Sequence, residues 1–478
     1  MRYRYKYLSS ILLMFIFVLF FSSFLLSDEK KTENITTPDT LNIKNALETT
    51  LKNNEQLKLV SQELTVLQSK LTESRRNIFP NISLKAEKTD GLAEARNGVP
   101  GFEEQSYTSQ INWSIFEGGR ITALFKQSKL NFFIGQLKYT KTKQELIYNT
   151  EEAYWNTARF MANLKNYESA SKDVKNYFNM AKKMYASNNI SKKEMLNTES
   201  QYNQAIYQIE TTKKDIENQV WILAEAMGLD FPPKNYPDSN IPAEKLALDL
   251  EKCLALCDKF HPDILTQNLL IDVNKYSLKI KNSYKLPKLT VQGSYGKSGG
   301  AYNSEKLNLN EDYYAGLQLS QVFMLNTLSV SDINQKTSPK VGQSTVSESH
   351  TSSAQLSILD NYKQLSEKKE AELAYNQAVY NLKKTKFTVE SEVRKTFTNY
   401  SKALLQIQNT QLEINILKQE LDIAKVTLGT DKTNIADIAT AINKYASGQA
   451  ALSDAKVFYL ISVAALKKAV GADDKIYN

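Results

Sequence analysis

The chain has 478 residues, of which only 16 are glycine and 10 are proline. These make up about 5% of the chain against a usual ~12%, so turn formers are too few for a large all-β protein or a loop-rich α/β enzyme. Two histidines and two cysteines leave little for metal or thiol chemistry. The net charge is +8, and after Arg2, Arg4 and Lys6 the remainder is too diffuse for a nucleic-acid surface. We therefore expect long helices, and no enzymatic activity, cofactor, metal site or nucleic-acid partner.

Residues 1–27 have the pattern of a secretory signal peptide. A basic start is followed by an apolar run from Leu8 to Leu26, interrupted only by serines, and the sequence turns polar at Asp28. The alternative is an uncleaved membrane anchor, because an apolar run of this length could just span a bilayer. Both interpretations predict that the rest of the chain is exported.

The remainder of the chain is internally duplicated. A shift of 207 residues aligns Pro80 with Pro287, and further along a shift of 243 aligns Gly228 with Gly471. The change of shift means that the second copy is 36 residues longer than the first. We predict two structural repeats, residues 28–233 and residues 234–478.

Each repeat is predicted to contain a helix, two strands, a long helix and a returning helix. The first repeat has these at 40–79, 81–90, 106–116, 121–185 and 191–227, and the second at 244–285, 288–296, 312–323, 354–428 and 435–470. Residues 326–353, rich in serine and threonine, form part of the excess and are interpreted as an exposed loop. A helix at 121–185 would be ~98 Å long. Such lengths fit a tall cylinder of antiparallel coiled coils rather than a compact globule.

The four predicted strands alternate apolar and polar residues with period two. Each is close to the ~9–11 residues of a tilted strand that crosses a bilayer. The alternative is a soluble four-stranded sheet packed against helices, and the strands alone do not decide between the two. Six residues of the apolar faces are interpreted as lipid-facing: Ile111, Trp113, Leu289, Val291, Leu317 and Leu319.

The export signal and the duplication favour membrane strands. Four strands in lipid would leave two edges with unsatisfied backbone groups, which hydrocarbon does not tolerate. Three copies of the chain would supply twelve strands and close the sheet. We therefore predict a homotrimer that shares one barrel in contact with membrane lipid.

Several segments resemble the TolC family of outer-membrane efflux proteins. They are residues 75–83 and 286–289 at the end of the first helix of each repeat, residues 115–120 before the first long helix, and Gly429-Thr430 at the second helix tip. The resemblance covers about residues 39–471. Residues 321–327 and Asn188-Asn189 depart from the family, which usually has glycine at both places.

The resemblance implies a fold and a function. The fold is mainly α with a small membrane β-barrel, in which three chains form a 12-stranded barrel in the outer membrane above an α-helical barrel in the periplasm. The function is a passive exit duct for tripartite efflux or type I secretion. Its partners are a periplasmic adaptor protein and an inner-membrane pump, which supply the energy. The rival interpretation is a periplasmic coiled-coil adaptor or tether, held by an uncleaved N-terminal anchor.

The resemblance also implies where the periplasmic entrance lies. Glu194 and Asp437 fall on the acids of the family's helix tips, and Asp431 and Lys432 lie near its tip ion pairs. We expect Glu194 and Asp437 to set cation selectivity, because converging carboxylates focus the field in a constriction. The alternatives are local: Glu194 as the capping-box partner of Ser191, Asp437 as an acid that compensates a helix dipole, and Lys432 as a solvated loop charge.

Two other features receive structural interpretations. Cys253 and Cys257 lie four residues apart on an amphipathic helix, and we expect them to be small buried residues, because helix geometry does not favour a disulfide there. His261-Pro262 occupies the position of a helix kink in the resembling family, so we expect no ligand role for His261.

Overall fold

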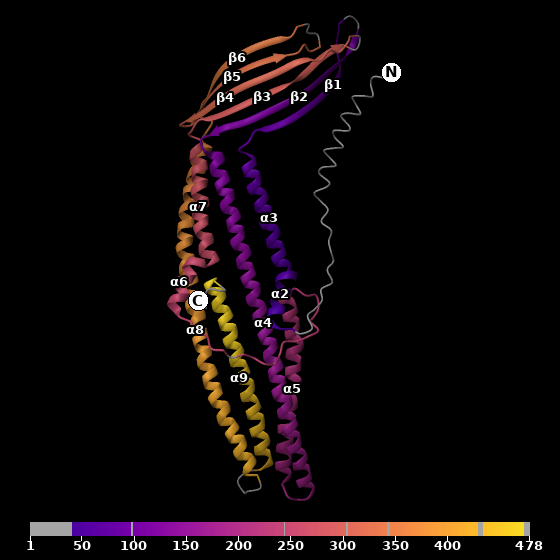
Figure 1. The fold of residues 1–478 in the computed structure, drawn as a ribbon, viewed down its shortest axis with the longest axis vertical. Coiled ribbons are helices and arrows are strands. Elements are labelled where there is room, and N and C mark those ends of the chain that lie inside the picture. The colour runs from indigo at the N-terminus through magenta and orange to yellow at the C-terminus, as the bar shows by residue number, and fades with distance from the viewer. Residues whose placement is uncertain are drawn as a thin grey trace. The chain divides into compact units, whose positions relative to one another are not determined.

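The computed structural model describes residues 41–96, 99–242, 244–302, 305–341, 345–428 and 434–472. The predicted signal peptide lies outside these residues. The described part of the chain is mainly helical, with one antiparallel sheet at one end of the helices (Figure 1).

The helices occur in three groups along the chain: before the first strand, between the second and third strands, and after the sixth strand. Their bounds are α2 (Ile43–Asn53), α3 (Glu55–Arg76), α4 (Arg120–Ala186), α5 (Lys192–Met227), α6 (Leu250–Phe260), α7 (Pro262–Ser283), α8 (Lys363–Val426) and α9 (Ile435–Val470). The long helices α4 and α8 have 67 and 64 residues. They run from the sheet to the far end of the molecule, where α5 and α9 turn back (Figure 1).

The first helix of each repeat is broken. The prediction of one helix at 40–79 is therefore wrong, and the helix predicted at 244–285 is two helices that meet at His261, where a kink was expected. Asn54 separates α2 from α3 with an extended backbone, and its side chain accepts from the next helix at Gln56 N and Leu57 N. His261 separates α6 from α7, and its Nδ1 accepts from Asp263 N at 3.2 Å. Asparagine and histidine thus cap the second helix of each pair, which satisfies backbone donors that a helix start leaves free.

The two breaks occupy equivalent positions of the two repeats and are packed in the same way. Asn54 lies against Gly228, and His261 lies against Gly471. Both glycines end a helix in the left-handed conformation, with φ of 67° and 72°. A β-carbon at either glycine would come within 2.9 Å of the backbone of the paired residue. The duplication therefore extends from the sequence to the contacts between helices.

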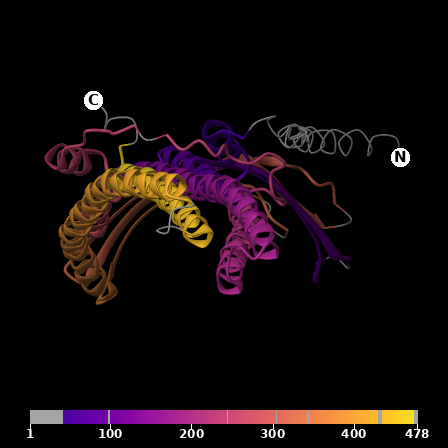
Figure 2. The same cartoon turned by 90° about the horizontal axis from the view of Figure 1, so that it is seen from below.

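The helices form one curved layer with two open edges. Next to the sheet, α4 packs between α3 and α7, and α7 packs against α8; farther away, α4 packs between α5 and α9, and α9 packs against α8. Seen along their length, the helices follow an arc (Figure 2). One edge of the layer is therefore α8, and the other consists of α3 and α5.

Helix α9 supplies much of the apolar core. Ile438, Leu466 and Val470 are completely buried, and buried alanines along the helix let its neighbours approach closely. Among the described residues it is the one helix long and apolar enough to cross a membrane, and half of its most apolar stretch is buried inside the protein. Helix α9 is this apolar because it packs between α4 and α8.

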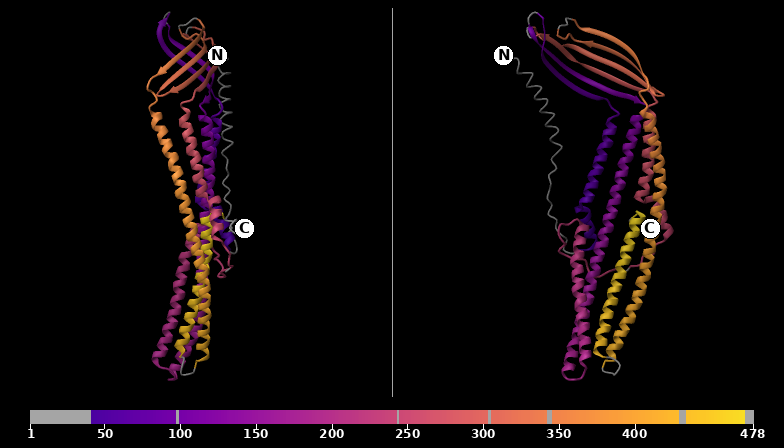
Figure 3. Two further views of the ribbon diagram at one scale, coloured as in Figure 1. Left: turned by 90° about the vertical axis from the view of Figure 1, so that its left-hand side faces the viewer. Right: turned by 180° about the vertical axis from the view of Figure 1, so that it is seen from behind.

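The sheet has six antiparallel strands in sequence order. They are β1 (Asn81–Arg96), β2 (Val99–Glu117), β3 (Lys288–Tyr302), β4 (Asn310–Phe323), β5 (Asn326–Thr337) and β6 (Ser347–Ser357). The first four are longer than predicted. Figure 3 shows β1 and β6 at the two edges of the sheet.

The prediction of an exposed loop at 326–353 is wrong, because this segment contains β5 and the first part of β6. Its strands escaped the search for alternation because serine, threonine, asparagine and glutamine occupy most positions of both strands. The sheet therefore has six strands per chain rather than four, and three copies would contribute three times six, or eighteen, if every strand joined one barrel.

Candidate functional site

One face of the first four strands is continuous and apolar. The register pairs Trp113 with Val291, and Val291 with Leu317, and directly paired side chains lie on the same face. Alternate residues along each strand extend that face. The structure thus brings together all six residues predicted to face lipid: Ile111, Trp113, Leu289, Val291, Leu317 and Leu319. Their contact with lipid stays a prediction.

Aromatic side chains lie at both ends of this apolar face. Near the helices, Trp113 is 37% exposed, and its indole nitrogen donates to the Ile78 carbonyl oxygen at 3.1 Å. Toward the far end, Tyr107, Tyr295 and Tyr313 are exposed, with Tyr107 ~20 Å along the strand from Trp113. An apolar band of ~25 Å between aromatic residues is typical of the lipid face of an outer-membrane barrel.

The opposite face of the same strands is polar. Gln110 pairs with Ser294, and Asn112 pairs with Gln292, which in turn faces Gly316 across the next pair of strands. A sheet with one apolar and one polar face separates two different surroundings. The four strands therefore suit a wall between lipid and water.

The passage from β2 into α4 is held by a buried charge. Gly118 has a φ of 59°, and a β-carbon there would lie 2.4 Å from the Ser283 carbonyl oxygen, so the position requires glycine. The Glu117 side chain is only 7% exposed; it accepts from Arg120 Nε at 2.5 Å and lies 3.6 Å from Lys288 Nζ. Glu117 and Arg120 line two adjoining pockets of about 570 and 330 Å³. Residues 115–120 thus turn the chain and make a polar junction between sheet and helices.

At the end away from the sheet, Glu194 joins the two helix hairpins. Its Oε1 accepts a hydrogen bond at 3.2 Å from the backbone nitrogen of Ile435, the first residue of α9. The carboxylate therefore also faces the positive end of that helix. Its own backbone nitrogen donates to Ser191 Oγ at 3.2 Å, which is half of the expected capping box. We call the contact between Glu194 and Ile435 the tip latch; no pattern in the sequence pointed to it.

Asp437 has a local role at the same end. Its carboxylate accepts from Asn434 N at 3.2 Å, and the Asn434 side chain accepts from Asp437 N at 3.0 Å, so the two residues form a reciprocal capping box. Asp431 and Lys432 lie outside the described residues. The structure brings Glu194 and Asp437 together at the start of α9, and their effect on ion selectivity stays a prediction.

A second set of contacts holds the hairpins together beyond the tip latch. Asn443 Nδ2 on α9 donates to the backbone oxygen and to Oε1 of Gln201 on α5, both at 3.0 Å. Tyr202 stacks on Phe178 with ring centroids 5.5 Å apart, next to a buried cluster that includes Val174. The tips of α5 and α9 are therefore joined by polar contacts over a small apolar core.

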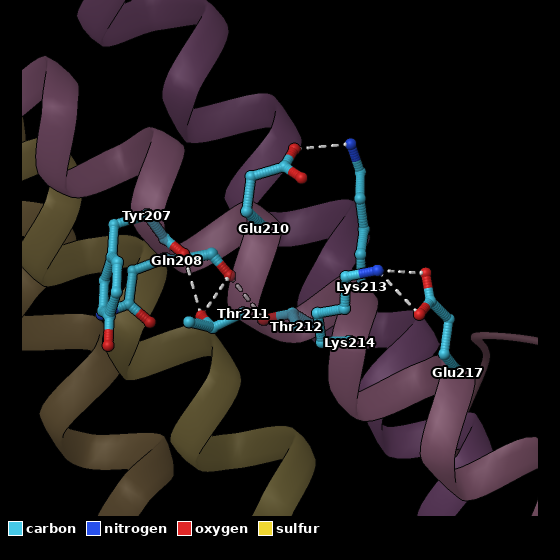
Figure 4. A network of polar contacts seen from close by, with 8 residues as sticks. All are labelled: Tyr207, Gln208, Glu210, Thr211, Thr212, Lys213, Lys214 and Glu217. Carbon is cyan, nitrogen blue, oxygen red and sulfur yellow. Dashed lines mark hydrogen bonds and ion pairs between the residues drawn. The ribbon is translucent and has the colours of Figure 1, made fainter.

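The two open edges of the helical layer carry exposed side chains of different character. On α5, the ion pairs of Lys213 with Glu210 and of Lys214 with Glu217 lie near the exposed Tyr207 (Figure 4). On α8, exposed apolar residues recur at coiled-coil spacing: Leu405, Leu412, Ile416, Ile423 and Val426. An exposed apolar seam of this kind is typical of a helix that packs against another chain.

The remaining candidates have structural roles. Cys253 and Cys257 are buried and free, and burial raises the pKa of the Cys257 thiol to about 12, so the thiol is unreactive. Burial also lowers the pKa of His261. Across the part of the chain that the structure describes, three or more His, Cys, Asp or Glu side chains nowhere gather as metal ligands would.

Comparison with known proteins gives consistent matches. The model of the outer membrane efflux protein family matches residues 46–229. The outer membrane protein TolC of Vibrio cholerae is 20% identical over 423 residues, which are 88% of this chain and 88% of that protein. Both descriptions name outer-membrane proteins.

Two solved structures have the same fold. The CmeC outer membrane channel of Campylobacter jejuni superposes with a TM-score of 0.71 at 18% identity, over 94% of this chain and 90% of that one. The outer membrane protein VceC of Vibrio cholerae gives a TM-score of 0.68 at 15% identity, over 90% of this chain and 96% of that one.

Proposed function

We propose that this chain belongs to the outer membrane efflux protein family, whose model matches residues 46–229, and that it forms the outer-membrane exit duct of an efflux or secretion system. The sheet would lie in the outer membrane, and the helices would extend into the periplasm. Transport through the duct would be passive.

The observation that carries this proposal is the two-faced sheet. An exposed apolar face with aromatic residues at both ends lies opposite a polar face, on four strands that follow one another in the sheet. Strands in lipid must have no free edge. The chain therefore needs further copies to close the wall, and we infer three, as in the resembling family.

The helical layer supports the same assembly. It is curved, and its edges are α8 on one side and α3 with α5 on the other. Packing the apolar seam of α8 against α3 and α5 of the next copy would close the layer into a tube. Leu59 and Val66 lie seven residues apart on α3 and are 60% and 53% exposed, so that helix also offers a coiled-coil surface.

The tips of the helices form the periplasmic entrance in this proposal. Glu194 and Asp437 from three copies would place six carboxylates near the duct axis, which would favour cations. An inner-membrane pump and a periplasmic adaptor would deliver the substrate and supply the energy. Opening would separate the α4–α5 hairpin from the α8–α9 hairpin and break the tip latch.

Mass and conductance test the function. The purified outer-membrane fraction is expected to contain particles with the protein mass of three chains, each 54.3 kDa before removal of any signal peptide, and to produce discrete conductance steps in a planar bilayer. A monomer found in the inner membrane, with no conductance, would instead indicate the coiled-coil tether.

Charge substitution tests the entrance. The double variant Glu194→Gln with Asp437→Asn is expected to raise the anion permeability measured from reversal potentials. The variant Glu210→Gln, on the exposed flank of α5, removes a carboxylate elsewhere and serves as a control. Unchanged selectivity in the double variant would refute a role for these two residues.

A further inference from the structure

The β5–β6 hairpin is an addition to the four strands that carry the apolar face. It follows β4 after a short turn and pairs with it along its whole length, from Phe323 with Asn326 to Tyr313 with Lys336. In Figure 1 the hairpin continues the sheet beyond β4. It therefore covers the edge that β4 would otherwise present to a neighbouring chain.

The face of the hairpin that continues the apolar face of β4 carries charged residues in its half away from the helices. Asp332 pairs with Leu317, a predicted lipid contact, and Lys336 pairs with Tyr313 at the aromatic end of that face. On β6 the same face carries Glu348, opposite Lys336. Charged side chains are expensive in lipid and rare on the outside of barrels.

The charged side chains of the hairpin contact polar groups of the hairpin itself. Lys336 Nζ lies 3.4 Å from Glu348 Oε1. His350 Nε2 lies 3.3 Å from Asp332 Oδ1, which also accepts from Ser352 Oγ at 2.7 Å. Nearer the helices the same face is apolar, with Leu328 and Val330 on β5 opposite Leu356 and Ala354 on β6.

The other face of the hairpin is polar except for Ile333. It carries Ser329, Ser331 and Gln335 on β5, with Ser349, Thr351 and Ser353 opposite on β6. A strand pair that is polar on one face and carries charged residues in half of the other suits water on both sides better than a wall between water and lipid. The hairpin thus differs in kind from the four strands before it.

Both ends of the hairpin have a strained backbone. Met324, in the turn before β5, and Leu359, after β6, have positive φ values of 56° and 59°, which are unfavourable for residues other than glycine. Met324 is 95% exposed. The two ends are close in space, because Asn361 N donates to the Leu325 carbonyl oxygen at 3.2 Å. The hairpin is therefore attached at one point, about which it would swing once its pairing with β4 is broken.

We propose that the β5–β6 hairpin is a removable cover of the β4 edge, which in the assembled duct gives that edge to β1 of a second copy and folds into the water-filled interior. This inference rests on the proposed trimeric duct. It means that three sets of four strands form the lipid wall, although each chain has six strands.

A disulfide lock tests the exchange of edges. Ser320→Cys with Ser329→Cys joins directly paired residues of β4 and β5, at a separation that a disulfide can bridge. The oxidised lock is expected to stay at the mass of one chain, and its reduction to restore the mass of three. The control, Thr290→Cys with Gln318→Cys, locks β3 to β4 and is expected to assemble whether oxidised or reduced.

The possible results separate this inference from the proposed function. Trimers that form with the β4–β5 lock oxidised would place the hairpin in the wall and refute this inference alone. Unmodified chains that stay monomeric would refute the duct and the inference together. A second lock, Gln318→Cys with Ser331→Cys, has the same expected result, so misfolding of one pair is recognised. The buried Cys253 and Cys257 remain in every variant.

Removal of the hairpin tests its place in the assembly. A variant without residues 326–358, with two glycines joining Leu325 to Leu359, uses ends that are already close. It is expected to form trimers with a higher single-channel conductance, because the interior loses three polar hairpins. A lower conductance would mean that the hairpins belong to the barrel wall, because removing them would narrow the barrel. A lower or an unchanged conductance would therefore refute the interior location.

Discussion

The tip latch provides a quantitative test of how the entrance opens. Replacing Glu194 with alanine removes the acceptor of the Ile435 backbone nitrogen, which lies 3.2 Å away in the structure. A hydrogen bond to a charged group contributes about 1.5–3 kcal/mol, and partial exposure of Glu194 reduces this to about 1 kcal/mol per chain. If all three latches break on opening, the closed state loses about 3 kcal/mol, and the open population rises roughly 150-fold.

Single-channel recording in planar bilayers measures this population directly. Glu194→Ala is expected to lengthen the time spent in the high-conductance state, and Glu194→Gln, which keeps an acceptor oxygen but loses the charge, to have a smaller effect. Flux of a small dye from liposomes that contain the trimer is a second readout of the same change.

Asp437→Asn is the matched control for the tip latch. It removes an acid at the same end of the molecule, but the hydrogen bonds of that acid within the described part of the chain lie in its own helix start. It is expected to lower the stability of α9 without favouring the open state. An open probability that rises equally in both variants, or in neither, would refute the assignment of the latch to gating.

Three further predictions concern stability and membrane insertion. Burial lowers the pKa of His261, so below about pH 6.5 the unfolded chain binds a proton that the folded chain excludes. Acid should therefore reduce the free energy of unfolding by up to about 1.4 kcal/mol per pH unit. His261→Asn should remove this contribution. Gly228→Ala should destabilise by about 1–3 kcal/mol more than Gly119→Ala, because both positions have positive φ but only the former would meet neighbouring backbone. Leu317→Lys should cost about 2–4 kcal/mol in lipid and impair insertion, whereas Gln318→Lys, on the opposite face, should be tolerated.

Each of these has a simple measurement. Thermal unfolding followed by far-ultraviolet circular dichroism at pH 7.5 and 5.5 compares His261→Asn with the unmodified chain, and equal acid sensitivity would contradict the histidine argument. The same method at neutral pH ranks the two glycine variants, and equal losses would contradict the packing described at Gly228. Recovery of trimers from the outer-membrane fraction compares the lysine variants, and equal yields would mean that Leu317 does not face lipid.

The sequence contains more of the fold than alternation and caps alone revealed. Pro262 marks the break at His261, and the shift of 207 relates His261 to Asn54, so applying the repeat to helix ends would have located the first break. The break at Asn54 escaped because no proline follows it, and its cap is formed by an asparagine that also occurs within helices.

The hairpin escaped for a different reason. Alternation detects a strand that has one apolar and one polar face, and in β5 and β6 the few apolar residues lie among polar and charged ones. The 36 extra residues of the second repeat indicated that it contains an insertion, but not that the insertion forms two strands. The tip latch was beyond pattern analysis, because the partner of Glu194 is a backbone nitrogen far along the chain.

The composition of α9 has a consequence for how the protein reaches its destination. A chain bound for the outer membrane first passes through the inner membrane, where a segment as apolar as α9 can be retained. Asp454 lies in the middle of this helix, and an acidic residue at the centre of a bilayer costs about 2.5–3.5 kcal/mol, which favours onward passage. In the folded protein Asp454 accepts from Asn163 Nδ2 at 3.2 Å and lies 3.7 Å from Arg159 Nε. Asp454 thus opposes retention of α9 in the inner membrane and, in the folded protein, joins α9 to α4.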